Sequence, residues 1–416
     1  MKNDPNLPRR CQGFSRRTLL ENSAVFAAAT ALSGSARAAR GTSSKPTLVQ
    51  VFLRLGMDGL TTVVPYGDAD LHALRPTLAI PPPGTSGGAL DLDGFFGLAP
   101  AAAPLLRPFG DGRLAIVHAA GSTDETRSHF EAIELMEFGD PDRPSGALGS
   151  GWGARYLSET AAAATGSLRG IGIGTHLPFT LNEAPLSLPI TDFTFDFPGR
   201  VSTAAQRQGA LLQAYARRHP VVSAPAFDTV ASFALAGIDF DGYTPENGAQ
   251  YPGSAFGFFL RSVAALIKAQ IGVEVISINY EGWDLHAQLG PVAGRMAQLL
   301  DDLTRSLEAF YLDMLGHQDD YVLACLSEFG RHASENGSLG VDHGHGNAMF
   351  VMGDVNGGQV IADWPGLSDD ALDNGDLDIT IDYRDVLGEI LLERMGVVDL
   401  APIFPGHGYT PRGVLS

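Results

Sequence analysis

Cysteine is scarce in this sequence, which has only two among 416 residues. Cys11 lies in an N-terminal segment that we expect to be removed, and Cys325 lies inside the apolar run 321–326. The mature chain would then hold one cysteine, which excludes an intrachain disulfide. The apolar surroundings of Cys325 predict a buried and unreactive thiol.

Basic residues are also few, since 28 Lys and Arg face 47 Asp and Glu and the net charge is −19. A surface this acidic argues against nucleic acid and anionic lipid as partners, because like charges repel. It still allows a local pocket, cationic or centred on a metal, for an anionic substrate. Long apolar runs are missing too, and no segment of the mature chain has the length and apolarity of a membrane span.

The N-terminal segment has the three-part order of a bacterial export signal. Arg16 and Arg17 precede apolar residues, a short alanine-rich stretch covers 23–32, and a small-x-small cleavage site covers 36–38. We therefore expect a signal over residues 1–38 that the twin-arginine export machinery recognises, with a folded product in the periplasm or outside the cell. A disordered basic tail is the alternative. Cleavage would remove six basic and two acidic residues and leave a net charge of about −23.

Strand-like and helix-like segments alternate along the mature chain. Continuously apolar runs, typical of strands covered on both faces, occupy 48–55, 114–120, 168–174, 273–280, 321–326 and 348–353. Helical spacing of apolar residues covers 130–138, 203–218, 255–271, 292–315 and 383–395. This alternation predicts an α/β fold with a mostly parallel sheet and helices on both faces. We expect one domain over 39–416, with loops at 81–88 and 141–153 and a loop-rich insertion around 175–253.

Polar side chains cluster where the predicted strands end, and ligands of open α/β sheets bind beyond the carboxyl ends of the strands. The residues concerned are Asp58, Thr61 and Thr62 after the first strand, Arg127, Ser128 and His129 after the second, Asp284 and His286 after the fourth, Glu328 and Arg331 after the fifth, and Asp342, His343 and His345 before the sixth. Histidine mixed with aspartate and glutamate is typical of zinc, manganese or iron sites. Asp284 and His286 lie two residues apart, so they face the same side of an extended segment.

Each of these motifs also has a purely structural explanation. Ser128 is well placed to cap the helix that follows, with Glu131 three residues on as in a capping box. His129 would then be a partly exposed surface histidine. Glu328 and Arg331 are spaced to pair with each other on one helical turn. The shared position of the motifs at strand ends is what favours a metal site.

At these motifs the chain resembles the bacterial domain-of-unknown-function family 1501, whose members are exported by the twin-arginine route and are related to the alkaline phosphatase and sulfatase superfamily. The resemblance begins near residue 46 and continues to the C-terminus. The segments that carry it are 51–60 around Asp58, 127–130 around Ser128, 282–286 around Asp284, 327–331 around Glu328, and 341–344 around Asp342. It implies an alkaline phosphatase-like or sulfatase-like fold.

The resemblance also implies roles for individual residues. Asp58 is similar to the first metal ligand of the superfamily, Asp342 and His343 to its late Asp-His pair, and Asp284 and His286 to the preceding pair, whose usual spacing is longer. Either His345 or His407 would be the late third histidine. The sulfatase nucleophile motif, Cys or Ser followed by x-Pro-x-Arg, is absent, so Ser128 is the best nucleophile candidate, with Thr61 or Thr62 in reserve.

Two functions follow as hypotheses. The first is an exported hydrolase of phosphate or sulfate esters that uses a divalent metal (zinc, manganese, calcium or magnesium) and acts on a small anionic ester or a polysaccharide. Arg331 would hold a substrate oxygen, and Glu328 would bind the metal or orient a ligand. The second is a non-catalytic, metal-containing or degenerate binding protein of the cell envelope that keeps the fold.

Overall fold

The computed structural model describes residues 45–415, apart from 145, 148, 162–167, 192 and most of 194–237. The predicted signal at 1–38 and most of the predicted helix at 203–218 lie outside the described residues. Contacts group Ser43–Thr194 with Ile238–Ser416 in one unit, and this unit contains every element discussed below. None of the helices described is both long and apolar enough to cross a membrane.

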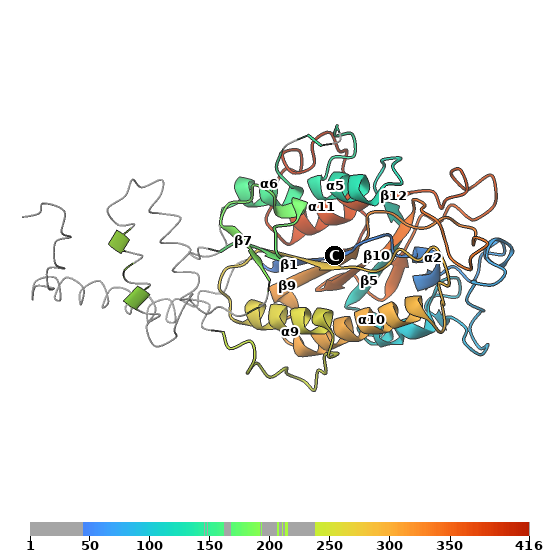
Figure 1. Ribbon diagram of the computed structural model, residues 1–416, viewed down its shortest axis with the longest axis horizontal. Coiled ribbons are helices and arrows are strands. Elements are labelled where there is room, and N and C mark those ends of the chain that lie inside the picture. The colour runs from blue at the N-terminus through green and yellow to red at the C-terminus, as the bar shows by residue number, and fades with distance from the viewer. Residues whose placement is uncertain are drawn as a thin grey trace, which may run out of the picture. The chain divides into compact units, whose positions relative to one another are not determined.

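A nine-stranded sheet forms the centre of this unit (Figure 1). Its strand order is β11-β5-β10-β9-β1-β8-β6-β7, with β12 paired to β5. The strands are β1 (Thr47–Leu53), β5 (Leu114–Gly121), β6 (Gly170–Ile173), β7 (Ser187–Ile190), β8 (Val275–Tyr280), β9 (Tyr321–Leu326), β10 (Asn347–Gly353), β11 (Gln359–Ile361) and β12 (Ile381–Asp382). All six predicted strands are confirmed, and β7, β11 and β12 are additions too short or too mixed in sequence to be recognised.

Helices cover both faces of the sheet, as predicted. Figure 1 shows α5, α6 and α11 on one face and α9 and α10 on the other. Their bounds are α5 (His129–Phe138), α6 (Trp152–Glu159), α9 (Ala255–Lys268), α10 (Arg295–Asp313) and α11 (Tyr383–Glu393). The predicted loop at 141–153 ends slightly early, because α6 begins at Trp152, whose side chain is buried in the core.

Smaller elements lie outside the main sheet. A three-stranded sheet joins β2 (Val63–Val64), β4 (Gly97–Leu98) and β3 (Leu90–Asp91). Short helical turns are α2 (Gly59–Thr62), α3 (Leu71–Leu74), η1 (Pro100–Leu105), α4 (Leu106–Gly110), η2 (Phe179–Leu181) and η4 (Gln318–Asp320).

The central strands are apolar because both of their faces are covered. Every residue of β1 and of β9 is buried, in agreement with the continuous apolar runs in the sequence. Cys325 lies in β9, and burial raises the pKa of its thiol, which is the inert cysteine that we predicted.

Strand direction brings the polar segments to one edge of the sheet. β1 runs parallel to β8 and β9, and β10 runs antiparallel to both β9 and β5. The amino end of β10 therefore lies at the same edge as the carboxyl ends of β1, β5, β8 and β9. The predicted meeting of the segment before β10 with the segments after the other strands is confirmed.

Candidate metal centre

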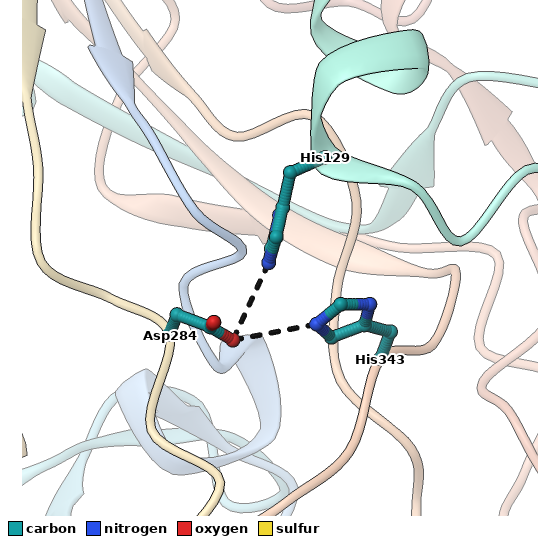
Figure 2. A group of neighbouring side chains, drawn as sticks. All are labelled: His129, Asp284 and His343. Atoms are coloured by element: carbon teal, nitrogen blue, oxygen red, sulfur yellow. Dashed lines mark hydrogen bonds and ion pairs between the residues drawn. The ribbon is translucent and has the colours of Figure 1, made fainter.

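Three side chains from distant parts of the chain meet at this edge: His129, Asp284 and His343. His129 is the first residue of α5, Asp284 follows β8, and His343 precedes β10. One ligand atom from each lies within 4.8 Å of the others. Figure 2 shows both imidazole rings directed at the carboxylate of Asp284.

Asp284 Oδ1 is the centre of the arrangement, which also includes His286. The Nε2 atoms of His129 and His343 each lie 3.3 Å from Asp284 Oδ1. His286 Nε2 lies 2.9 Å from the same oxygen and 3.0 Å from His343 Nε2. Asp284 and His286 thus face the same side, as their spacing of two residues predicted.

The opposite ring nitrogen of each histidine is bonded to an acceptor. His343 Nδ1 lies 2.6 Å from the backbone oxygen of Arg127, His129 Nδ1 lies 2.7 Å from Glu328 Oε1, and His286 Nδ1 lies 2.8 Å from Asp342 Oδ1. Carbonyl and carboxylate oxygens only accept, so each Nδ1 carries the proton. In the neutral rings each Nε2 then presents a lone pair.

The neutral form of His343 is favoured by its surroundings. Burial lowers the pKa of this ring, and the neighbouring His129 and Arg331 act in the same direction, against the bond to the carbonyl oxygen of Arg127. The Nε2 of His343 therefore faces the group as an acceptor. Acceptor atoms at these distances repel one another unless a proton or a cation lies among them.

The spacing of these atoms fits a metal ion. Ligand atoms about 2.0–2.1 Å from a tetrahedral ion are about 3.3 Å from one another. The three distances to Asp284 Oδ1 and the distance between His286 and His343 run from 2.9 to 3.3 Å. His129, Asp284 and His343 are thus arranged as a single set of ligands, and His286 lies beside this set, close to Asp284 and His343.

The buried Arg331 is hydrogen-bonded to Asp284, one member of this set. Its side chain is buried, and it donates to the backbone oxygens of Gly56, Leu55 and Trp283 and, at 2.9 Å, to Asp284 Oδ1. Burial by itself would raise the pKa of Asp284, but the hydrogen bond and charge of Arg331 outweigh it and lower that pKa to about 2. Arg331 thereby keeps Asp284 ionised and fixes its orientation; its contact with a substrate oxygen stays a prediction.

Glu328 and Asp342 each accept a hydrogen bond from the Nδ1 of a histidine, Glu328 from His129 and Asp342 from His286. The buried Glu328 carboxylate also accepts a hydrogen bond from the backbone N–H of Leu55, at 2.9 Å. Asp342 is exposed and accepts from Asn336 as well as from His286. Glu328 was predicted either to bind the metal or to orient a ligand, and its contact with His129 is suited to the second role. Asp342 makes the same kind of contact with His286.

Asp58 does not join the group. Both of its carboxyl oxygens are bonded to the guanidinium of Arg75, at 2.6 and 3.1 Å, and Thr61 Oγ1 lies 2.5 Å from Asp58 Oδ2. Thr62 donates to the backbone oxygen of Asp58. All four side chains are buried, so Asp58 and Arg75 form a separate ion pair at the start of α2, to which Thr61 is hydrogen-bonded.

The two histidines proposed as a late third ligand also lie elsewhere. His345 Nδ1 is 3.6 Å from Asp373 Oδ2 and 4.0 Å from Asp376 Oδ2. His407 Nε2 is 2.8 Å from Asp385 Oδ1. Neither is in the group of His129, Asp284 and His343.

Ser128, the predicted nucleophile, directly precedes His129 in the chain. It is the N-cap residue of α5, but its side chain makes no capping hydrogen bond. The predicted capping box with Glu131 is therefore wrong: Glu131 accepts from the hydroxyl of Thr126, which in turn accepts the backbone N–H of Ser128. The hydroxyl of Ser128 is exposed and is not used for capping.

His129 was not among the metal ligands predicted from the sequence. The structural explanation given above made it a partly exposed surface histidine next to a helix cap, whereas its ring is packed against Phe329 and points into the group. Its position after β5, in line with the other strand-end motifs, was the available signal.

The sequence of this chain matches a known protein family. It belongs to the family described as protein of unknown function (DUF1501), whose match covers residues 124–399. A search of curated proteins found no match.

Similar solved structures are distant in sequence. A PsFucS1 sulfatase from Pseudoalteromonas sp. is 14% identical, with a TM-score of 0.35 over 92% of this chain and 73% of that one. The phosphonate monoester hydrolase of Agrobacterium radiobacter is 10% identical, with a TM-score of 0.32 over 88% and 79%. Ps i-CgsB in complex with k-i-k-neocarrahexaose is 11% identical, with a TM-score of 0.38 over 87% and 74%.

Proposed function

We propose that this member of the DUF1501 family is an exported, metal-dependent hydrolase of phosphate or sulfate esters. The observation that carries the proposal is the convergence of the Nε2 atoms of His129, His286 and His343 on Asp284 Oδ1, with each Nδ1 committed to an acceptor. The ester class comes from the resemblance of the strand-end motifs to the alkaline phosphatase and sulfatase superfamily.

The ligand set favours some metals over others. Imidazole nitrogens with one carboxylate suit zinc, manganese or iron, whereas calcium and magnesium prefer sites made of oxygen atoms. Of the four ions considered from the sequence, zinc and manganese therefore fit this group best. A bound ion would act as a Lewis acid and lower the pKa of a coordinated water or hydroxyl.

The residues around the group would supply orientation and a nucleophile. Arg331 keeps Asp284 ionised, and Glu328 fixes the ring of His129. Ser128 offers an exposed hydroxyl one residue before His129, whereas the hydroxyl of Thr61 is buried against Asp58. In a two-step hydrolysis, Ser128 Oγ would bond to phosphorus or sulfur as the alcohol leaves, and water would then release the acid.

One observation favours the second hypothesis, a non-catalytic protein. His286 lies close enough to Asp284 and His343 to serve as a fourth protein ligand, and closed sites with four protein ligands are typical of structural zinc. Such a protein would hold one ion for stability and bind cell-envelope material without cleaving it.

Metal removal and reconstitution separate the two functions. We expect the purified mature protein to contain one tightly held ion per chain and to cleave an aryl phosphate or aryl sulfate. Turnover should disappear on chelation and return when zinc or manganese is added. His343→Ala should abolish it, and replacement of the exposed His72, which lies outside the group, should not. One ion per chain without turnover of either ester class would support the binding protein, and an absence of bound metal would contradict the hydrolase.

A further inference from the structure

The three side chains of the group and the neighbouring His286 are not held equally firmly. The side chains of His129 and His343 are 11% and 23% exposed, and that of Asp284 is 35% exposed. Their partners are the buried Glu328, the backbone of Arg127 and the buried Arg331. His129 and Asp284 are therefore anchored by buried side chains, and His343 by a backbone carbonyl oxygen.

His286 is anchored only from the solvent side. Its side chain is 44% exposed, and the partner of its Nδ1 is Asp342, whose side chain is 61% exposed. Water competes with a hydrogen bond in such a position, so this bond contributes little to holding the ring in place.

The backbone around His286, in contrast, is fixed. The segment that follows β8 is paired with the segment before His343: the backbone oxygen of His286 accepts from Asn336, and the backbone N–H groups of Gln288 and Leu289 donate to Ser338 and Leu339. Gly340 approaches His286 so closely that a Cβ there would lie 2.2 Å from its carbonyl carbon. Movement of the ligand would thus be a rotation of the side chain into solvent, without movement of the loop.

We propose that His286 is an exchangeable ligand, and that an anionic substrate enters the metal centre by taking its place. Catalytic zinc sites have three protein ligands and one open position, whereas a site with four is closed. Rotation of His286 converts the second arrangement into the first and leaves His129, His343 and Asp284 as the three permanent ligands. This inference rests on the proposed function for the nature of the incoming ligand, but its test does not require turnover.

Cobalt-substituted protein tests the proposal, because the visible spectrum of cobalt reports the number and kind of its ligands. His286→Ala should keep one ion per chain with an affinity lowered by no more than about 100-fold, the loss that removal of a residue orienting a ligand can cause, because His129, His343 and Asp284 still bind the ion. His129→Ala should lose far more. Titration with inorganic phosphate should change the spectrum of the wild type, and His286→Ala should bind phosphate at least about tenfold more tightly, because no protein ligand has to be displaced.

Asp342→Asn serves as a second, milder variant. It leaves the ring of His286 in place but weakens its orientation, so its phosphate affinity should lie between those of the wild type and His286→Ala. Loss of metal from His286→Ala as complete as from His129→Ala would overturn the proposal, as would phosphate binding that is unchanged or weaker in His286→Ala. If the ordering holds but no ester is cleaved, the exchangeable ligand stands and the hydrolase function fails.

Discussion

Glu328 Oε1 lies 2.7 Å from His129 Nδ1, although the two residues are 199 positions apart in the sequence. The contact joins the end of β9 to the start of α5 and turns the Nε2 atom of His129 towards Asp284. A carboxylate behind a histidine in this way fixes the tautomer and the direction of the ring.

Glu328→Gln tests this relationship. The amide oxygen can still accept from the backbone of Leu55, so we expect the fold to be kept, while metal affinity falls by about 10–100-fold. Competition with a chromogenic chelator measures the affinity. Glu159→Gln, at an exposed glutamate of α6, is the matched control and should leave it unchanged.

Asp58→Asn tests whether Asp58 is the ion-pair partner of Arg75, as in the structure, or a metal ligand, as the resemblance to the superfamily implies. Asp58 and Arg75 form a buried ion pair, and breaking such a pair costs about 3–5 kcal/mol of folding stability because one charge stays buried and unpaired. We expect this loss in urea unfolding, with metal content unchanged. Loss of the bound ion with little loss of stability would instead identify Asp58 as a ligand.

Ser128→Ala tests the nucleophile. The side chain of Ser128 makes no capping bond, so stability should change by no more than about 0.5 kcal/mol. Metal content should stay the same and ester turnover should be abolished. Full turnover in this variant would leave attack by water, or by Thr61, as the remaining routes.

The ion pair between Asp284 and Arg331 predicts a pH dependence in the metal-free protein. Burial opposes the ionised form, but Arg331 prevails and the pKa of Asp284 falls from 3.8 to about 2. The stabilisation is therefore complete above the unfolded value of 3.8 and is lost as pH falls towards 2. The gap in urea midpoint between wild type and Asp284→Asn should narrow below about pH 4. A gap independent of pH would show that this pair does not stabilise the fold.

Much of the fold and part of the site could be predicted from the sequence. Strands such as β1 and β9 are apolar throughout because both faces are covered, and this marks them in the sequence. The two-residue spacing of Asp284 and His286 likewise predicted that they face the same side.

The roles of Asp58 and His129 depended on partners that the sequence does not pair with them. The guanidinium of Arg75, the residue that follows α3, reaches Asp58 before α2, and no local sequence pattern predicts this contact. His129 follows the N-cap residue of α5 in the sequence, but its ring is oriented by Glu328, which follows β9. Such long-range contacts decide which of several polar residues at a sheet edge form a site.

The most direct test of the metal centre is a crystal structure of the zinc-loaded mature protein with anomalous diffraction data at the zinc edge. We predict one anomalous peak about 2.0–2.2 Å from the Nε2 atoms of His129 and His343 and from a carboxyl oxygen of Asp284, with either His286 or a solvent ligand in the fourth position. A peak between Asp58 and Asp342, or no peak at the edge of the sheet, would contradict a metal centre formed by His129, Asp284 and His343.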